Sequence, residues 1–557
     1  MKLEKIRIGD KEIWPFTIPS GIITTQVSCL ERLAKEIPEL GILTTKSIGL
    51  KPRGVPEGGE VGNLDPGKQY GNREPILSQY IPGGFINAVG LTNPGAEAFA
   101  NELSKADFPK NKFLLASIFG KNAEEFVYVA KTLEDYVDGF ELNLSCPHAR
   151  EVGMVLGQDP EVVHEITDSV FGFTDKPIFA KLTPNKGNIG DIAKSAISAG
   201  AYGVTAINTV GPGDHYHDGH PILTNVFGGL SGDGIKPIGL KCVREVRAAI
   251  GEKVPIIGMG GIGSAVDVRD YHSAGADIFG IGSALAGMDD EQLREYYPTL
   301  VNDLENGTNS SLLLLQNIDM TYHKVKVREV LNNNCDFKIF RTNRDIQADP
   351  GQFVFAWIPG VGEKPFSVMD DSPLTLGVLE KGPFTKKFNS LMRYDSFYVR
   401  GPYGRGIDFP TGSDICLVGG GCGIAGIHLL AKRFSEHSNV LSILATKSGD
   451  YLYNLDDEFH KYGKLRIATE NGTLGIKGLV TDVMFNSDLK QGTYFVNCGP
   501  RAMVDAVLPL ELQFTGPTRI YSSLDYMTRC GVGICGSCAD ENGRRTCIEG
   551  PFMKANL

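Results

Sequence analysis

Short apolar runs recur along the first 300 residues, and each is followed by an amphipathic or loop segment. There are eight such runs, at 16–22, 41–47, 113–119, 138–145, 177–183, 203–209, 254–260 and 278–284. Helical spacing of apolar residues marks segments between them, such as 122–136, 191–200, 238–250 and 265–275. This strand–helix alternation predicts an α/β fold of the (β/α)8 barrel type, with an open doubly wound sheet as the alternative.

The second half of the chain has a different pattern. A polar, turn-forming stretch at 305–311 precedes closely spaced strand patterns at 322–330, 336–340, 352–357, 374–379 and 396–399. Such strands, separated by Gly and Pro turns, predict a small antiparallel barrel. From residue 415 a strand, a glycine-rich loop and a helix follow one another, which predicts a Rossmann-like α/β domain.

These patterns divide the chain into five predicted parts. We expect a barrel domain at 1–305, a linker at 306–317, an antiparallel β-barrel at 318–410, a Rossmann-like domain at 411–512 and a cysteine-rich domain at 513–557. The length of 557 residues agrees with several domains, because single cores stop growing well below that size.

Charge and hydropathy exclude some classes of function. The net charge of −11 leaves no basic surplus to neutralise phosphates, so we expect no nucleic-acid partner. No apolar run reaches the ~18 residues of a membrane span, and the first residues lack the apolar core of a signal peptide. We therefore expect a cytoplasmic protein with no membrane association.

The predicted barrel strands end in polar or glycine residues. In a (β/α)8 barrel these ends meet at one mouth, where active sites lie. Asn side chains suit a planar cyclic amide, Lys46 can pair with a carboxylate, and Lys181 can neutralise a developing flavin anion. The residues at the ends are Ser20, Lys46, Ser47, Ser117, Asn143, Cys146, Lys181, Asn208, Thr209, Gly260, Gly261, Gly282 and Ser283.

Cys146 follows an apolar strand pattern and precedes Pro147. Proline cannot continue a strand ladder, so we expect the thiol on a loop beside polar amides. A thiol in that place suits a base that removes a carbon-bound proton. The alternative is a buried structural cysteine.

Glycine-rich segments follow the last two predicted barrel strands, at 258–263 and 280–283, and a third lies at 228–232. Backbone N–H groups approach an anion closely where side chains are absent. Barrels of this type place a phosphate site after strands seven and eight, so these segments predict a phosphate-bearing cofactor.

Four of the eleven cysteines crowd together near the end of the sequence, and their spacing follows the plant-type [2Fe–2S] pattern. Intervening glycines free backbone N–H groups to bond the sulfurs. A structural zinc site is the alternative, although zinc prefers paired Cys-x2-Cys knuckles. The cluster indicates a metal centre in a reducing compartment, formed by Cys530, Cys535, Cys538 and Cys547.

The first half of the chain resembles the catalytic subunit of the class 1B dihydroorotate dehydrogenases, through motifs at 44–49, 87–95, 143–147, 181–185 and 228–232. The resemblance implies that Cys146 is the catalytic base and that Lys181 serves the reaction. It implies substrate contacts from Lys46, Asn87, Ala88, Val89, Gly90, Leu91, Asn143, Asn208 and Thr209. It implies FMN contacts from Ser20, Lys46, Ser47, Ser117, Asn143, Lys181, Ile207, Gly232, Gly260, Gly261, Gly282 and Ser283.

The second half resembles the electron-transfer subunit of the same enzymes, a ferredoxin-reductase-like module. The resemblance makes the four cysteines the ligands of a [2Fe–2S] cluster, and a motif at 498–503 resembles the nicotinamide side of such reductases. The segment 445–448 lacks an acidic residue, so the choice between NAD and NADP stays open. FAD contacts carry over to Lys364, Pro365, Phe366, Ser367, Gly382 and Thr385. The glycine-rich loop lets a helix N-terminus come close to a pyrophosphate, which predicts cofactor contacts from Gly420, Gly421 and Gly423.

Together the resemblances imply an NAD-dependent dihydroorotate dehydrogenase that oxidises (S)-dihydroorotate to orotate in de novo pyrimidine biosynthesis. The implied cofactors are FMN, FAD, a [2Fe–2S] cluster and NAD, with electrons passing from FMN through the cluster and FAD to NAD⁺. Here the two subunits are joined in one chain. By analogy with related barrels, we expect a homodimer formed through the barrel domain.

Two alternative functions remain open. His148 stands where the family usually has Asn, and 146–148 with 157–160 is similar to dihydropyrimidine dehydrogenases, which act on uracil and thymine. The loop at 87–94 favours dihydroorotate, because the loop that it resembles in dihydroorotate dehydrogenases meets the substrate carboxylate, which uracil lacks. The second alternative is a non-catalytic electron-relay component of a larger complex.

Three histidines, His215, His217 and His220, lie close together in a stretch rich in Gly and Asp. Their spacing resembles that of metal ligands, but no neighbouring carboxylate or cysteine completes a set. We therefore interpret this stretch as a lid or rim loop.

Overall fold

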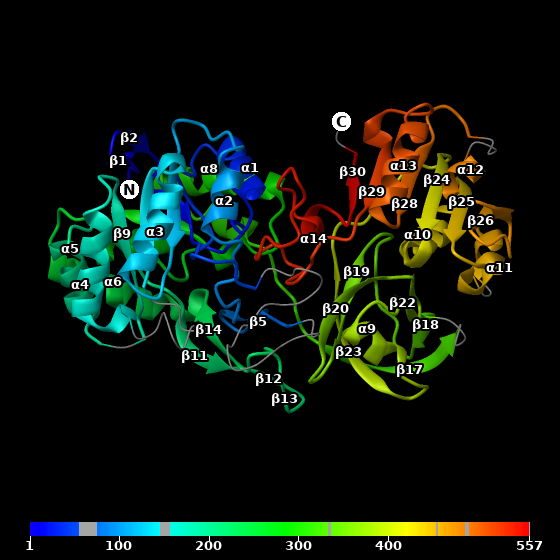
Figure 1. Ribbon diagram of the computed structural model, residues 1–557, viewed down its shortest axis with the longest axis horizontal. Helices are drawn as coiled ribbons and strands as arrows, with labels where there is room; N and C mark the ends of the chain where they lie inside the picture. Colours follow the sequence, from blue (N-terminus) through cyan, green and yellow to red (C-terminus); the bar gives the residue numbers. More distant parts are fainter. Residues whose placement is uncertain are drawn as a thin grey trace. The chain divides into compact units, whose positions relative to one another are not determined.

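The computed structural model describes residues 1–54, 75–144, 156–185, 187–331, 336–452, 455–484 and 489–555 (Figure 1). The chain forms two compact units. The first comprises Met1–Asp319 with Val532–Arg544, and the second comprises Met320–Gly531 with Arg545–Leu557. Within the described ranges, no helix combines the length and the apolar composition needed to cross a bilayer.

Eight parallel strands close into a barrel in the first unit, in the order β10-β15-β16-β3-β4-β7-β8-β9. Each strand lies inside one of the predicted apolar runs, so the (β/α)8 prediction is confirmed and the open-sheet alternative is wrong. The strands are β3 (Phe16–Ile18), β4 (Ile42–Thr44), β7 (Phe113–Ile118), β8 (Gly139–Asn143), β9 (Ile178–Leu182), β10 (Gly203–Ala206), β15 (Ile256–Met259) and β16 (Ile278–Gly280).

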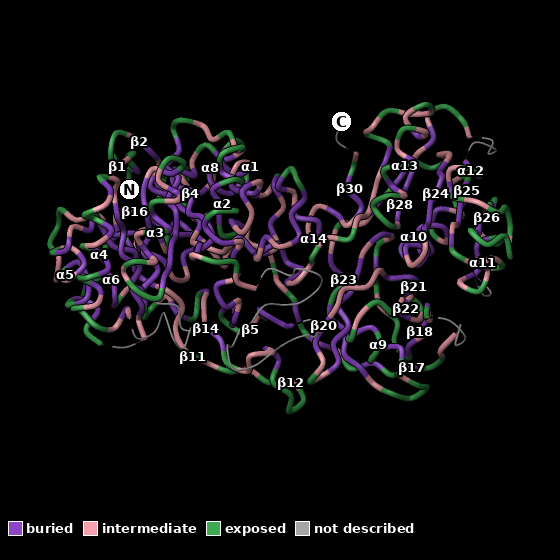
Figure 2. The backbone as a smooth tube through the Cα atoms, in the orientation of Figure 1, coloured by how far each residue is buried: buried purple, intermediate pink, exposed green. Residues whose placement is uncertain are grey.

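Amphipathic helices cover the barrel, and their buried faces continue the core that Figure 2 shows in purple. α3 buries Phe126, Val129, Ala130 and Leu133, which share one helical face. Its N-terminus is capped by Asn122, whose side chain accepts a hydrogen bond from the Glu125 N–H. The helices are α1 (Val27–Glu36), α2 (Ala96–Leu103), α3 (Ala123–Leu133), α4 (Pro160–Phe171), α5 (Ile189–Ser198), α6 (Lys236–Ile250), α7 (Ala265–Ala274) and α8 (Asp290–Asn306).

A second sheet in this unit is antiparallel, in the order β11-β14-β6-β5. The register pairs Asn87 with Gly229, so a predicted substrate residue meets the glycine-rich segment 228–232. The segment interpreted as a lid or rim loop contains a two-stranded hairpin, turned by Asp218 and Gly219 at positive φ. These strands, with an N-terminal hairpin, are β1 (Ile6–Ile8), β2 (Lys11–Ile13), β5 (Ser78–Ile81), β6 (Gly84–Asn87), β11 (Val210–Asp214), β12 (Tyr216–His217), β13 (His220–Pro221) and β14 (Phe227–Ser231).

The second unit begins with a seven-stranded antiparallel sheet in the order β20-β19-β23-β17-β18-β22-β21. Phe340, Phe388 and Phe397 pack edge to face in its core. This sheet corresponds to the predicted antiparallel barrel. Its elements are β17 (His323–Leu331), β18 (Phe337–Thr342), β19 (Phe353–Ile358), β20 (Gly362–Ser367), β21 (Asp370–Asp371), β22 (Leu374–Leu379), α9 (Pro383–Asn389) and β23 (Ser396–Tyr403).

A mostly parallel sheet follows in the order β27-β26-β25-β24-β28-β29-β30, as expected for a Rossmann-like domain. β24 lies between β25 and β28, so the C-terminal ends of β24 and β28 flank the position where such sheets bind ligands. The strands are β24 (Asp414–Gly420), β25 (Asn439–Thr446), β26 (Lys464–Thr469), β27 (Ile476–Lys477), β28 (Tyr494–Cys498), β29 (Ile520–Ser523) and β30 (Phe552–Lys554). The helices are α10 (Ile424–Phe434), α11 (Leu455–Lys461), α12 (Val480–Met484), α13 (Arg501–Glu511) and α14 (Thr546–Glu549).

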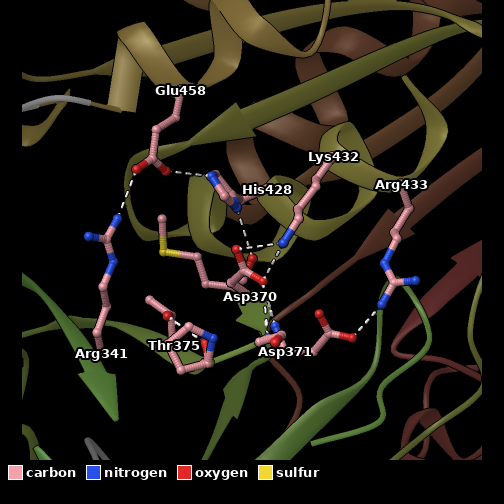
Figure 3. Close-up of polar contacts among 11 residues, drawn as sticks. Arg341, Asp370, Asp371, Thr375, His428, Lys432, Arg433 and Glu458 are labelled. Atoms are coloured by element: carbon pink, nitrogen blue, oxygen red, sulfur yellow. Dashed lines mark hydrogen bonds and ion pairs between the residues drawn. The ribbon is translucent and has the colours of Figure 1, made fainter. Parts of the chain in front are cut away.

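Polar contacts join the two sheets of the second unit (Figure 3). The His428 ring, on α10, lies 2.9 Å from the Met369 carbonyl through Nδ1 and 2.9 Å from Glu458 Oε2 through Nε2. The Glu458 carboxylate also pairs with Arg341 on β18. The hydrogen bond from His428, with a smaller contribution from the charge of Arg341, holds the pKa of Glu458 below its usual range. Two further ion pairs tie α10 to β21, Lys432–Asp370 and Arg433–Asp371.

Candidate active site

A cavity of about 290 Å³ lies at the C-terminal ends of the barrel strands. Residues far apart in the sequence meet there because most strands of the barrel contribute their C-terminal ends. The predicted residues that line it are Ser20, Lys46, Ser47, Asn87, Val89, Gly90, Leu91, Asn143, Lys181, Ile207, Asn208, Thr209, Gly232, Gly260, Gly261, Gly282 and Ser283.

Three of the predicted site residues do not line the cavity in the part of the chain that the structure describes. Ala88 is buried beside the cavity. Ser117 is buried one layer below, with its Oγ 2.9 Å from Ser47 Oγ. Cys146 lies outside the described residues, because the range that contains β8 ends at Leu144 and the next one begins at Leu156.

Hydroxyl and amide groups form a continuous hydrogen-bonded chain across four strand ends. Ser47 Oγ lies 3.0 Å from Ser20 Oγ and accepts a hydrogen bond of 2.9 Å from Asn143 Nδ2. The Asn143 side-chain oxygen accepts from Asn208 Nδ2 at 3.4 Å, and the Asn208 oxygen accepts from the Thr209 N–H at 2.9 Å. These contacts fix the orientation of both amides, which is what recognition of a planar ring with donors and acceptors requires.

Lys181 has a buried partner that the sequence analysis did not identify. Its Nζ donates to Glu141 Oε1 at 3.2 Å, and the exposed fractions of the two residues are 4% and 1%. Glu141 and Asn143 are two residues apart on β8, so they point to the same side of the strand. Glu141 is the one charged residue of the mostly apolar β8 strand, and this was the sequence signal that could have indicated a buried partner for Lys181.

Asn93 supports the loop that carries Val89, Gly90 and Leu91. Its Oδ1 accepts hydrogen bonds from the backbone N–H groups of Gly49 and Gly95, at 3.1 and 2.9 Å, and its Nδ2 donates to the Leu91 carbonyl at 2.9 Å. This buried side chain therefore fixes the loop from below. The sequence analysis placed Asn93 in a motif but gave it no role.

The glycine segments approach one another closely at the cavity. A Cβ at Gly261 would lie 2.8 Å from the Gly232 carbonyl oxygen, and one at Gly232 would lie 2.5 Å from the Gly84 Cα. Side chains are thus excluded, and the backbone of these segments borders the cavity directly. Such a cradle, with Lys181 nearby, fits the phosphate and the ring of a flavin mononucleotide.

The loop 532–544 belongs to the same unit as the barrel, and Ile534 and Cys535 line the cavity. The Ile23 N–H donates to the Ile534 carbonyl at 2.8 Å, and Thr25 Oγ1 donates to the Cys535 carbonyl at 2.6 Å. These partners are more than 500 residues apart in the sequence, so no local pattern could have revealed them.

The four cysteines that the sequence groups together have buried or half-buried side chains. Cys530, Cys535 and Cys538 lie on a glycine-rich loop, and Cys547 lies on α14. Cys530 and Cys547 belong to the second unit, whereas Cys535 and Cys538 belong to the first. Among the residues that the structure describes, no three His, Cys, Asp or Glu side chains are gathered as a metal ion would require. The donor set of four thiols still has the chemistry of a [2Fe–2S] ligand set.

The residues predicted to bind FAD and NAD lie in the second unit. Lys364, Pro365, Phe366 and Ser367 are on β20, and Thr385 Oγ1 accepts the N–H groups of Lys381 and Gly382 at 2.9 and 3.0 Å. Gly420 is the last residue of β24, and Gly421 and Gly423 lie in the turn that joins it to α10, as the prediction of a strand, loop and helix required.

Two of these three glycines also have a packing role. A Cβ at Gly423 would lie 2.0 Å from the Cys498 carbonyl oxygen, and one at Gly420 would lie 2.3 Å from Met503 Sδ. Gly421 instead borders open space. Close packing on β28 thus explains Gly423 without a ligand, and close packing on α13 explains Gly420.

Comparisons with known proteins agree with this site. The family model for dihydroorotate dehydrogenase matches residues 9–294, more than half of the chain. The catalytic subunit of dihydroorotate dehydrogenase B (NAD(+)) from Pyrococcus abyssi is 42% identical over 286 residues, covering 51% of this chain and 87% of that protein. The subunit of the same name from Methanocaldococcus jannaschii is 41% identical over 275 residues, covering 49% of this chain and 83% of that protein.

A solved structure is also similar, that of the NADH-dependent reduced ferredoxin-NADP oxidoreductase, described in the context of flavin-based electron bifurcation. It shares 26% identity and covers 43% of this chain and 88% of that chain, with a TM-score of 0.37, too low to support a conclusion. The family match does support a conclusion, because residues 9–294 include all eight strands of the barrel. This chain belongs to the dihydroorotate dehydrogenase family, and it is an oxidoreductase.

Proposed function

We propose that the chain oxidises (S)-dihydroorotate to orotate at the barrel mouth, as a step of de novo pyrimidine biosynthesis, and transfers the electrons to NAD⁺. The observation that carries the proposal is one cavity, in a chain of this family, that is lined by Lys46, Lys181 and hydrogen-bonded asparagines. Relatives named as NAD(+)-dependent enzymes support the choice of electron acceptor.

Dihydroorotate fits this set of side chains. Its ring carries amide donors and acceptors, which the fixed amides of Asn143 and Asn208 complement. Its carboxylate requires a cation and N–H donors, and Lys46 with the loop at Asn87–Leu91 borders the same cavity. Uracil and thymine lack a carboxylate, so they would leave these donors without a partner.

FMN, when bound, supplies the hydride acceptor. The residues proposed to hold its phosphate are at Gly260, Gly261, Gly282 and Ser283, where backbone N–H groups border the cavity. The Lys181 ammonium, which Glu141 holds, would supply a positive charge that stabilises negative charge developing on the bound ring.

Cys146 is the proposed base, and it removes the proton from C5 of the substrate. It lies two residues beyond Leu144, immediately after β8, the strand that carries Glu141 and Asn143. Active-site residues of such barrels are found after strand ends, which supports this assignment.

The finer proposal concerns the second half of the chain. Electrons leave the barrel through a [2Fe–2S] cluster held by the four cysteines and then through FAD, with domains at 318–410, 411–512 and 513–557 joined to the barrel 1–305 by the linker 306–317. The cysteine spacing and the positions of β24 and β28 support it. We also propose that the protein is a homodimer through the barrel.

The test is a steady-state assay of the full chain, reconstituted with FMN, FAD, iron and sulfide. We expect NADH formation with dihydroorotate, and a preference over dihydrouracil of about 100-fold or more, since a polar site rejects a substrate that leaves its donors unpaired. Faster turnover of dihydrouracil would assign the chain to the dihydropyrimidine reaction. Absence of turnover with both substrates, despite bound cofactors, would favour an electron-relay role.

A further inference from the structure

We propose that the buried ion pair between Glu363 and Arg400 positions Cys530, the first cysteine of the proposed cluster, relative to the strand that carries the proposed FAD residues. The inference deepens the proposed function and rests on it. All of its residues belong to the second unit.

Arg400 lies on β23 and is fully buried, with an exposed fraction of 0%. Its Nη2 donates to Glu363 Oε1 at 2.7 Å and its Nε donates to Glu363 Oε2 at 2.9 Å. Glu363 lies on β20, which β19 separates from β23 in the same sheet, and it is also buried. This two-point contact gives the guanidinium a single orientation.

The remaining donors of Arg400 point to the backbone at the start of the cysteine loop. Nη1 donates to the Cys530 carbonyl at 2.8 Å, and Nη2 also donates to the Arg529 carbonyl at 3.2 Å. One side chain thus joins a carboxylate on β20 to two consecutive carbonyls of the loop. Because Arg400 cannot deprotonate, these contacts persist at every physiological pH.

Aromatic rings enclose the guanidinium. It lies 3.9 Å from the centroid of the Phe355 ring and 5.3 Å from that of Tyr403. The same two rings touch the loop, since a Cβ at Gly531 would lie 2.9 Å from Phe355 Cε2 and 3.1 Å from Tyr403 Cδ2. The turn after Cys530 is therefore packed on the same wall that holds Arg400, which leaves the loop little room to move.

Glu363 connects Arg400 to the strand that carries the proposed FAD residues. It immediately precedes Lys364 and Pro365, the first two residues of the proposed FAD motif on β20. Tyr322 donates to Glu363 Oε2 at 2.6 Å, the same oxygen that accepts from Arg400 Nε, and so also fixes the carboxylate. The contacts from the Cys530 carbonyl through Arg400 and Glu363 to β20 are short and buried throughout.

The arrangement has a redox consequence. Groups that orient a ligand residue and hydrogen-bond near it tune the potential of the metal centre as well as its position. Arg400 and Glu363 are therefore positioning residues. Neither side chain lines the barrel cavity, so loss of their ion pair changes the environment of Cys530 and removes no residue from the cavity.

The test uses the full chain with its cofactors bound. Arg400→Met removes every donor but leaves the Glu363 charge buried, so the double variant Glu363→Gln with Arg400→Met is made in parallel to preserve folding. Arg400→Lys retains the charge without the planar fork. Three quantities are measured: the cluster potential by an EPR-monitored titration, hydrogen exchange at 529–531, and reduction of the cluster by NADH.

We expect the double variant to show a shifted cluster potential, faster exchange at 529–531 and an NADH-driven reduction that is slower by about tenfold. Arg400→Lys is expected to recover only part of each change. Reduction of the barrel flavin by dihydroorotate should stay the same in all variants. An unchanged potential, EPR signal and exchange rate in the folded double variant would overturn the inference, whereas a wild-type chain that holds no cluster would instead contradict the proposed function.

Discussion

The Lys181 ammonium lies 3.2 Å from Glu141 Oε1 inside the barrel, where both side chains are almost inaccessible to solvent. Lysines on barrel strands are easily interpreted from sequence as rim charges in solvent. This one is held by a carboxylate that emerges from the neighbouring strand, β8, and it lines the cavity. Its direction is thus fixed before any ligand arrives, which is the condition for effective stabilisation of developing charge.

Replacement of Glu141 tests this pair. Glu141→Ala leaves the Lys181 ammonium without its carboxylate, and breaking such a buried pair costs about 3–5 kcal/mol of stability. We expect a lower midpoint of denaturant unfolding and a slower reduction of bound flavin by dihydroorotate. Glu141→Gln is the matched control: it retains a hydrogen-bond acceptor and should preserve more of both quantities. Wild-type flavin reduction in Glu141→Ala would show that the carboxylate does not orient Lys181.

Substitution of Thr25 tests whether reduction of the barrel flavin can be separated from the later transfer of electrons to NAD⁺. Its hydroxyl donates to the Cys535 carbonyl at 2.6 Å, and Thr25→Val removes that hydrogen bond, which is worth about 1 kcal/mol. We expect NAD⁺ reduction to fall severalfold while dihydroorotate reduces the barrel flavin at the wild-type rate.

Thr132→Val serves as the control for this variant. The Thr132 hydroxyl also donates to a backbone carbonyl, that of Tyr128 at 2.9 Å, but it lies on the exposed face of α3. Its loss should leave both rates unchanged. Equal rates of NAD⁺ reduction in Thr25→Val and wild type would remove Thr25 from the positioning of the loop.

The buried carboxyl of Glu511 should make the free energy of unfolding depend on pH. Burial raises the pKa of this carboxyl to about 7, and the side chain, with an exposed fraction of 0%, accepts a hydrogen bond of 3.0 Å from Asn497 Nδ2. Because the folded-state pKa exceeds the unfolded value, the protonated carboxyl contributes stability that is fully present below the unfolded pKa of about 4.3 and is lost as pH rises toward 7.

Glu511→Gln mimics the protonated carboxyl at every pH. We expect the variant to exceed the wild type in unfolding free energy by up to about 3 kcal/mol at about pH 8, and by little at about pH 4. Urea unfolding of both proteins across this range measures the difference. A difference independent of pH would show that Glu511 does not titrate on unfolding.

Substitutions of Gly421 and Gly423 distinguish two reasons for glycine in the Rossmann-like domain: the approach of a ligand at Gly421 and close packing at Gly423. Gly423→Ala places a Cβ 2.0 Å from the Cys498 carbonyl oxygen, so we expect a large loss of stability. Gly421→Ala meets no neighbouring atom within 4 Å and pays only for its positive φ of 54°, a cost of about 1 kcal/mol. Thermal unfolding ranks the two variants. A weaker affinity for NAD⁺ in a well-folded Gly421→Ala chain would support the proposed dinucleotide site.

The barrel was predictable because its signal is local. Each strand is an apolar run of a few residues, and the strand ends carry the polar groups, so Lys46, Asn143, Lys181 and Asn208 could be assigned to one mouth before any coordinates were known. Strand order in a (β/α)8 barrel follows sequence order, which left little topology to decide.

Contacts made by non-local pairing were missed. Asn87 meets Gly229 across an antiparallel sheet, and Thr25 meets Cys535 across almost the whole length of the chain. Glu141 was hidden for a different reason: a charged residue in a buried strand has a meaning only once its partner is known. Periodicity describes one segment at a time, so it carries no information on which segments meet.

The most direct test of the account is anaerobic rapid mixing of the FMN-loaded chain with dihydroorotate, followed by the flavin absorbance. Cys146→Ala is compared with Cys242→Ala, whose thiol is buried on α6 with its pKa raised by burial to about 11 and so serves as an inert control. The account predicts rapid bleaching in the wild type and in Cys242→Ala, and slow bleaching in Cys146→Ala with flavin still bound. Equally fast bleaching in Cys146→Ala, or none in the wild type, would contradict it.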